Sequence, residues 1–161
     1  MTSATCSGTG TMVHESAADP DQLAEIYLRE QDGMLVGHLI PSQVTLSELR
    51  DRVGEFLKSA GTDSDVAEIA VLAVSELVGN AVRACDEGVP VIADAHVSKE
   101  GVVVGITDPE PSRLPTPSAV PLDNAEADSG RGLAMLEVLG VDITVELTPF
   151  SKRVVCTIPL P

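Results

Sequence analysis

The chain has 161 residues, of which 43% are hydrophobic and only 2% aromatic, and it carries a formal net charge of −15. This length and apolar content suit a single domain with one sizeable core and a tail. The charge argues against a nucleic-acid surface, because phosphate binding draws on clustered Lys and Arg, and the scarcity of aromatic residues removes stacking platforms for single strands. A protein partner or a locally held small anion fits better.

The cysteines and histidines predict neither a disulfide framework nor a metal site. Cys6, Cys85 and Cys156 are odd in number, widely spaced and without a CxxC pair, and the three histidines are scattered. The N-terminus has no positively charged start followed by an apolar segment, which predicts no signal peptide. No apolar run approaches the roughly 18 residues of a membrane span. These features predict a soluble protein of the reducing cytoplasm.

Residues 1–33 are predicted to form an N-terminal extension that is partly disordered. The first 18 residues are rich in Ser, Thr and Gly. Residues 19–30, DPDQLAEIYLRE, offer a capping Asp, a Pro at the first helical position and an apolar stripe. We therefore expect a short amphipathic helix there, ahead of a domain covering residues 34–161.

The next part of the chain predicts a strand and two long helices. MLVGHLI, residues 34–40, has the composition of a strand and ends at Pro41. Residues 44–61 keep apolar side chains at helical spacing and end in a glycine. The segment TDSD then supplies acidic and hydroxyl residues for the start of a second helix over residues 65–85.

The remaining sequence predicts mainly strands. They cover residues 89–97, 101–108, 141–148 and 152–160, with a helix over 130–140. Helices cluster early and strands late, so the predicted class is α+β: a two-layer α/β sandwich with a mixed or antiparallel sheet covered on one face by helices.

The second helix carries unexpected polar residues in an apolar run. In SELVGNAVRA, Glu76 and Asn80 are one helical turn apart on the same face, so both can reach the same small object. Asp65 and Arg83 fall on the same stripe. The stripe is either a ligand-facing surface or simply the solvated face of the helix.

A long loop separates two further candidate groups. Residues 109–129 contain five prolines and an acidic stretch, and loops of more than about 15 residues are usually functional lids or disordered. The loop begins after Asp108, a carboxylate ending an apolar strand, and stops at SGRG. There Gly130 and Gly132 let a helix N-terminus approach an anion closely. The alternative is an ordinary cap at Ser129 followed by a turn glycine.

Taken together, these features resemble a known superfamily. E-x-x-x-N on a helix, a strand ending in Asp, a long loop and G-x-G-L opening another helix are similar to the nucleotide-binding core of DNA gyrase, Hsp90, histidine kinases and MutL (GHKL). The resemblance covers roughly residues 34–161. The short length, the SELVGNAVRA segment and the final hairpin are most similar to bacterial anti-sigma-factor serine kinases.

The resemblance implies a Bergerat-type ATP-binding fold and roles for three residues of the second helix. Asn80 would bind Mg²⁺ bridging the phosphates, a task that suits an amide oxygen because Mg²⁺ takes hard oxygen ligands. Glu76 would be the general base that accepts the proton of an attacking serine hydroxyl or water. Arg83 would contact phosphate.

It also implies roles for residues around the loop. Asp108 would accept a hydrogen bond from the adenine amino group. The phosphates would be cradled by backbone N–H groups of Gly130, Arg131, Gly132 and Leu133 while the loop closes over them. The implied partners are a sigma factor and an anti-anti-sigma protein of the STAS type, with a homodimer formed through the sheet edge.

The sequence also departs from the family pattern. The usual D-x-G-x-G is DPEPS here, with Glu110 and Ser112 in place of glycines, and Ala84 replaces a frequent histidine. Lost glycines leave less room for a nucleotide, and the added carboxylate would repel triphosphate. An ATP-dependent serine kinase and a binding module with a degenerate pocket therefore both remain open. A detached sensor-kinase domain is a third option, disfavoured because no phospho-acceptor histidine helix precedes the core.

Overall fold

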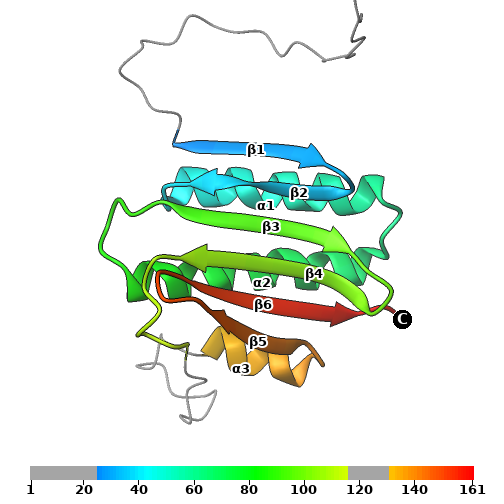
Figure 1. Cartoon of the computed structure of the whole chain (residues 1–161). Coiled ribbons are helices and arrows are strands. Elements are labelled where there is room, and N and C mark those ends of the chain that lie inside the picture. Colours follow the sequence, from blue (N-terminus) through cyan, green and yellow to red (C-terminus); the bar gives the residue numbers. More distant parts are fainter. Residues whose placement is uncertain (1–24, 116–130) are drawn as a thin grey trace, which may run out of the picture.

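The computed structural model describes residues 25–115 and 131–161. In these residues one antiparallel sheet has the strand order β1-β2-β3-β4-β6-β5, and α1 and α2 pack on one face of it (Figure 1). The elements are β1 Ile26–Gln31, β2 Met34–Leu39, α1 Gln43–Ser59, α2 Ser64–Ala84, β3 Val91–Val97, β4 Gly101–Asp108, α3 Arg131–Val138, β5 Asp142–Leu147 and β6 Lys152–Pro159. The predicted α+β class is confirmed, and every strand pair is antiparallel.

The helix predicted over residues 19–30 is wrong in its described part. Ile26–Gln31 is strand β1, which pairs with β2 in a hairpin. The turn is Asp32-Gly33, and both residues have positive φ, 53° and 75°, as the favoured two-residue hairpin turn requires. The sheet therefore begins at Ile26, inside the predicted extension, while residues 1–24 lie outside the described part of the chain.

The two long helices begin and end where local signals place them. Ser42 and Thr45 form a reciprocal capping box at the start of α1. Gly61, with φ of 76°, follows its last turn. The side chain of Asp63 accepts a hydrogen bond of 2.9 Å from the Asp65 N–H at the start of α2.

The core lies between the sheet and the helices and consists of small and branched aliphatic side chains. Alternate residues of β4, such as Val102, Val104 and Ile106, face it, and α2 contributes residues such as Ala73 and Leu77. Leu133 and Leu136 of α3 complete it at the β5 end. Among the described residues, no helix is long and apolar enough to cross a membrane.

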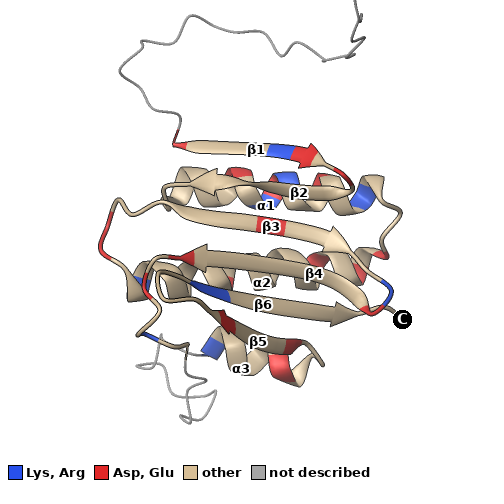
Figure 2. Ribbon diagram, in the orientation of Figure 1, with Lys and Arg blue, Asp and Glu red and all other residues tan. Residues whose placement is uncertain are grey.

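The central strands β3, β4 and β6 carry only four charged side chains, and all four are in ion pairs (Figure 2). Asp94 and Arg153 pair at 2.6 Å on the sheet face opposite α1 and α2. A Cβ at Gly105 would lie 2.8 Å from each of these two side chains, so the glycine makes room for the pair. Asp108 and Lys152 pair on the helix-covered face.

Candidate functional site

The start of α3 lies directly against the carboxylate of Glu76 on α2. A Cβ added at Gly132 would overlap the Glu76 side chain, so a larger residue there would force Glu76 to move. A carboxylate at a helix N-terminus is favoured by the partial positive charge there. The structure thus brings together two of the predicted site residues, from helices that are separated in the chain by two strands and the long loop.

Two side chains beside this contact have buried hydrogen-bond donors without partners. They are Nε and Nη2 of Arg131, the first residue of α3, and Nδ2 of Asn80, one turn after Glu76. None of these atoms finds an acceptor among the described residues. An unsatisfied buried donor costs about 1–3 kcal/mol, more when charged. A ligand rich in acceptor oxygens would therefore gain the most binding free energy by accepting hydrogen bonds from these donors.

Arg83 binds the predicted metal ligand in this structure. Its Nη2 donates to Oδ1 of Asn80 at 2.5 Å, and its guanidinium lies back along α2 near Gly79. Mg²⁺ would have to take this oxygen from Arg83, which would free the exposed guanidinium for a phosphate. No group of three or more His, Cys, Asp or Glu side chains suited to a metal occurs in the described residues. The donor set therefore fits a metal held mainly by phosphates and water, as Mg²⁺ usually is.

Asp108 ends β4 and is almost completely buried, with 2% of its surface exposed. Its Oδ2 lies 3.3 Å from Nζ of Lys152, which is equally buried, and its Oδ1 accepts a hydrogen bond of 2.9 Å from the Glu110 N–H. Lys152 also donates to the carbonyl oxygen of Arg113. Sequence reasoning missed Lys152, whose one signal was a cation at an inward-facing position of an apolar strand.

Cys85, at the end of α2, connects this group to the helix. Burial raises the pKa of the Cys85 thiol, and the charge of Asp108 and a hydrogen bond to it raise the pKa further. Because an α-helix rises about 1.5 Å per residue, Glu76 and Cys85 are about 14 Å apart along α2. Glu76, Asn80 and Cys85 thus follow one another along the last turns of α2, with the tip of α3 against Glu76 and Asp108 beside Cys85.

The DPEPS segment forms a local turn. The backbone N–H of Ser112 donates to Glu110 Oε1 at 3.1 Å, and the Ser112 hydroxyl donates to the same oxygen. These bonds lower the pKa of Glu110. The two residues that replace family glycines thus bond to each other beside Asp108.

The remaining predicted residues divide between the core and the undescribed loop. Leu133 is buried in the core, so only its backbone is a candidate for ligand contact. Gly130 and the loop from residue 116 onward lie outside the described residues. The guanidinium of Arg131 was missed from the sequence, which pointed only to the backbone there.

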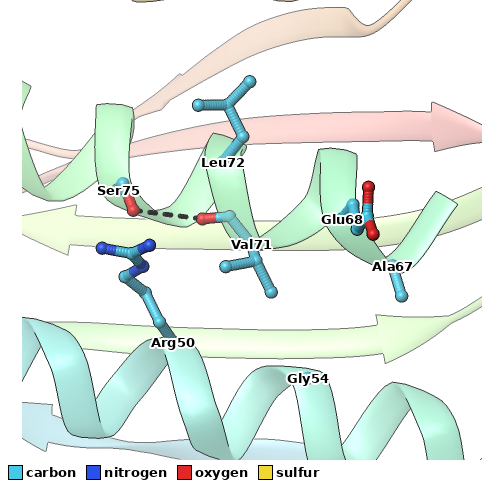
Figure 3. Close-up of a pocket in the computed structure, with 7 residues that line it drawn as sticks. All are labelled: Arg50, Gly54, Ala67, Glu68, Val71, Leu72 and Ser75. Carbon is cyan, nitrogen blue, oxygen red and sulfur yellow. Dashed lines mark hydrogen bonds between the residues drawn. The ribbon is translucent and has the colours of Figure 1, made fainter. Parts of the chain in front are cut away.

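A separate hollow of about 520 Å³ lies between α1 and α2 (Figure 3). Arg50 and Gly54 line it from α1, and Glu68 and Ser75 from α2. The Ser75 hydroxyl donates to the carbonyl of Val71 at 3.2 Å. None of the predicted site residues lines this hollow, so it is distinct from the Glu76 face.

Comparison with known families agrees with the arrangement around α2. Residues 41–157 match the model of the histidine kinase-like ATPase domain. The chain belongs to this family. The membership confirms the predicted superfamily and identifies an ATP-binding domain. The segment that matches the family model starts after β1 and β2. No curated protein matches the chain.

Changing Gly132 to alanine tests the contact between α2 and α3. The added methyl group would force the half-buried Glu76 side chain to move, and we expect Gly132→Ala to have a free energy of unfolding about 1 kcal/mol below that of Gly54→Ala. Chemical denaturation measures it. Gly54→Ala is the matched control, because its Cβ would meet only Val71 at 3.9 Å and alanine favours a helix. Equal stability of Gly132→Ala and Gly54→Ala, which share the helix-propensity gain of alanine, would contradict the contact.

Proposed function

We propose that the protein is an ATP-binding anti-sigma factor with serine/threonine kinase activity toward a STAS-type anti-anti-sigma partner. The observation that carries the proposal is the set of buried donors of Arg131 and Asn80 that have no partner in residues 25–115 and 131–161, next to the contact between Glu76 and Gly132. Those donors suit phosphate oxygens, and a carboxylate beside them suits a proton acceptor. Family membership supports the ATP-binding part.

Each residue of the site has a distinct task in this proposal. Bound Mg·ATP supplies the phosphoryl group and a neutralising cation. Asn80 would hold the metal through Oδ1, and Arg83 and Arg131 would bind phosphate oxygens. Glu76 accepts the proton of the incoming serine hydroxyl. Phosphoryl transfer depends mainly on positioning and charge neutralisation, so this small set of residues is sufficient.

A binding module that holds its partner independently of ATP is the second candidate. It is favoured by the surroundings of Asp108, where both carboxylate oxygens already have partners and the Glu110–Ser112 turn lies alongside. In this alternative the helical surface is the functional part, and nucleotide has no effect on partner binding.

Thermal unfolding with and without Mg·ATP separates the two candidates. At 100 times its Kd a ligand stabilises the fold by about 2.7 kcal/mol, which raises the Tm of a domain of this size by several degrees. We expect this shift in the wild type and its loss in Asn80→Ala. Arg50→Ala, in the hollow between α1 and α2, is the control that keeps the shift. No shift of the wild type at millimolar ATP would leave only the binding module.

The partners follow from the proposed function. We propose that the chain acts in the cytoplasm as a homodimer joined at an edge of the sheet, where β1 and β5 are the outermost strands. Light scattering of the purified protein tests the dimer, and a monomer at micromolar concentration would refute it. Co-purification from the native cell, with and without ATP, tests for a sigma factor and a STAS-domain protein.

A further inference from the structure

We propose that Lys152 is a positioning residue that keeps Asp108 ionised, and that it thereby sets a preference for a purine with an amino group at C6. The inference rests on the proposed function, because it concerns the base end of the same nucleotide site. It goes further by giving a second strand, β6, a part in base selection.

The geometry makes Lys152 the counter-charge of Asp108. The two residues are direct cross-strand partners in the pairing of β4 with β6. Their charged atoms are 3.3 Å apart, and each side chain is only 2% exposed. Around them lie the Cys85 thiol at the end of α2 and the segment from Glu110 to Arg113. Lys152 is the one cation within ion-pair distance of Asp108 among the described residues.

Burial decides what Asp108 becomes without this lysine. A carboxylate removed from water and lacking a cation is strongly destabilised as an anion, and it takes up a proton instead. The thiol of Cys85 lies beside Asp108 but brings no positive charge. Lys152 is therefore the group that allows a charged carboxylate to persist at this depth.

The charge state of Asp108 determines which base it can read. An ionised carboxylate only accepts hydrogen bonds, whereas a protonated one also donates. Adenine presents an amino group at C6 and so donates to the anion. Hypoxanthine presents an oxygen there, which the anion repels and the neutral acid accommodates. The ion pair thus favours ATP over ITP.

The test is the ratio of the Kd values of ITP and ATP, measured by calorimetry with saturating Mg²⁺. A hydrogen bond to a charged group is worth a factor of about 10 to 100, and we expect a wild-type ratio in that range. Lys152→Met should bring the ratio close to 1, although Asp108 is still present. Lys152→Arg, which retains the cation, should restore most of the preference.

Arg153→Met is the matched control, because Arg153 is the next residue of β6 and pairs with Asp94 on the opposite face of the sheet. It should leave the ratio unchanged. If Lys152→Met does not fold, the neutral pair Asp108→Asn with Lys152→Met replaces it, and loss of the preference is again expected.

Three results would overturn the inference. The first two are an unchanged ratio in Lys152→Met and an unchanged ratio in the neutral pair. The third is tighter ATP binding by Lys152→Met, which would mean that nucleotide must break the ion pair of Lys152 and Asp108 in order to bind. A wild-type chain that binds neither ATP nor ITP would instead refute the proposed function, so the two failures are distinguishable.

Discussion

Replacing Lys152 by methionine is expected to lower the free energy of unfolding by about 3–5 kcal/mol, the usual cost of removing one partner of a buried ion pair. The variant leaves the buried carboxylate of Asp108 without its cation, and the carbonyl of Arg113 loses its donor. Urea denaturation near pH 7 measures the change.

Arg153→Met is again the comparison. The Arg153 side chain is 25% exposed, so water can replace part of the interaction that Asp94 loses in this variant. Its loss should be clearly smaller than that of Lys152→Met. Combining Lys152→Met with Asp108→Asn should recover part of the stability, because no unpaired charge remains. Equal losses in the two single variants would show that Asp108 is hydrated rather than buried with Lys152.

Replacing Glu76 by glutamine is expected to slow phosphate transfer to a STAS-type partner by a factor of about 10² to 10⁴, the usual contribution of a general base. Glutamine keeps the shape of the side chain and its place beside Gly132, but it cannot accept the proton. Binding of Mg·ATP should persist, because the change removes a negative charge near the phosphates. Transfer of labelled phosphate in a single turnover measures the effect.

Glu68→Gln provides the control for this experiment. Glu68 lies two turns earlier on α2, is exposed, and lines the hollow toward α1. Its replacement should leave both transfer and ATP binding unchanged. Transfer by Glu76→Gln at the wild-type rate would remove Glu76 from the role of base, even if ATP binding is intact.

Most of the fold could be predicted because its signals are local. The period of the apolar residues, the glycine after α1 and the TDSD segment before α2 placed the two helices within a few residues. The first strand was missed because the prediction rested on the capping signals near Asp19 and left out the hairpin signal of Asp32-Gly33. Pairing with β2 makes this segment a strand. The pairing joins residues as far apart as Ile26 and Leu39, whereas a helix cap involves only residues within one turn.

The site was predictable only in part, for a related reason. The spacing of Glu76 and Asn80 revealed a shared face, and a glycine motif marked the start of α3. The partner of Asp108 depends on β6 lying next to β4, an adjacency that spacing along the chain does not reveal. The lack of partners for Nε and Nη2 of Arg131 among the described residues likewise depends on what surrounds them in three dimensions.

The neighbouring cations Lys152 and Arg153 have a consequence for how the last strand finds its place. They point to opposite faces of the sheet, and each meets an acid on its own side. Because side chains alternate along a strand, sliding β6 by one position would exchange the two faces and leave both cations opposite unsuitable neighbours. A shifted β6 would lose both ion pairs at once. The two pairs together therefore favour the native register of β6 during assembly of the sheet.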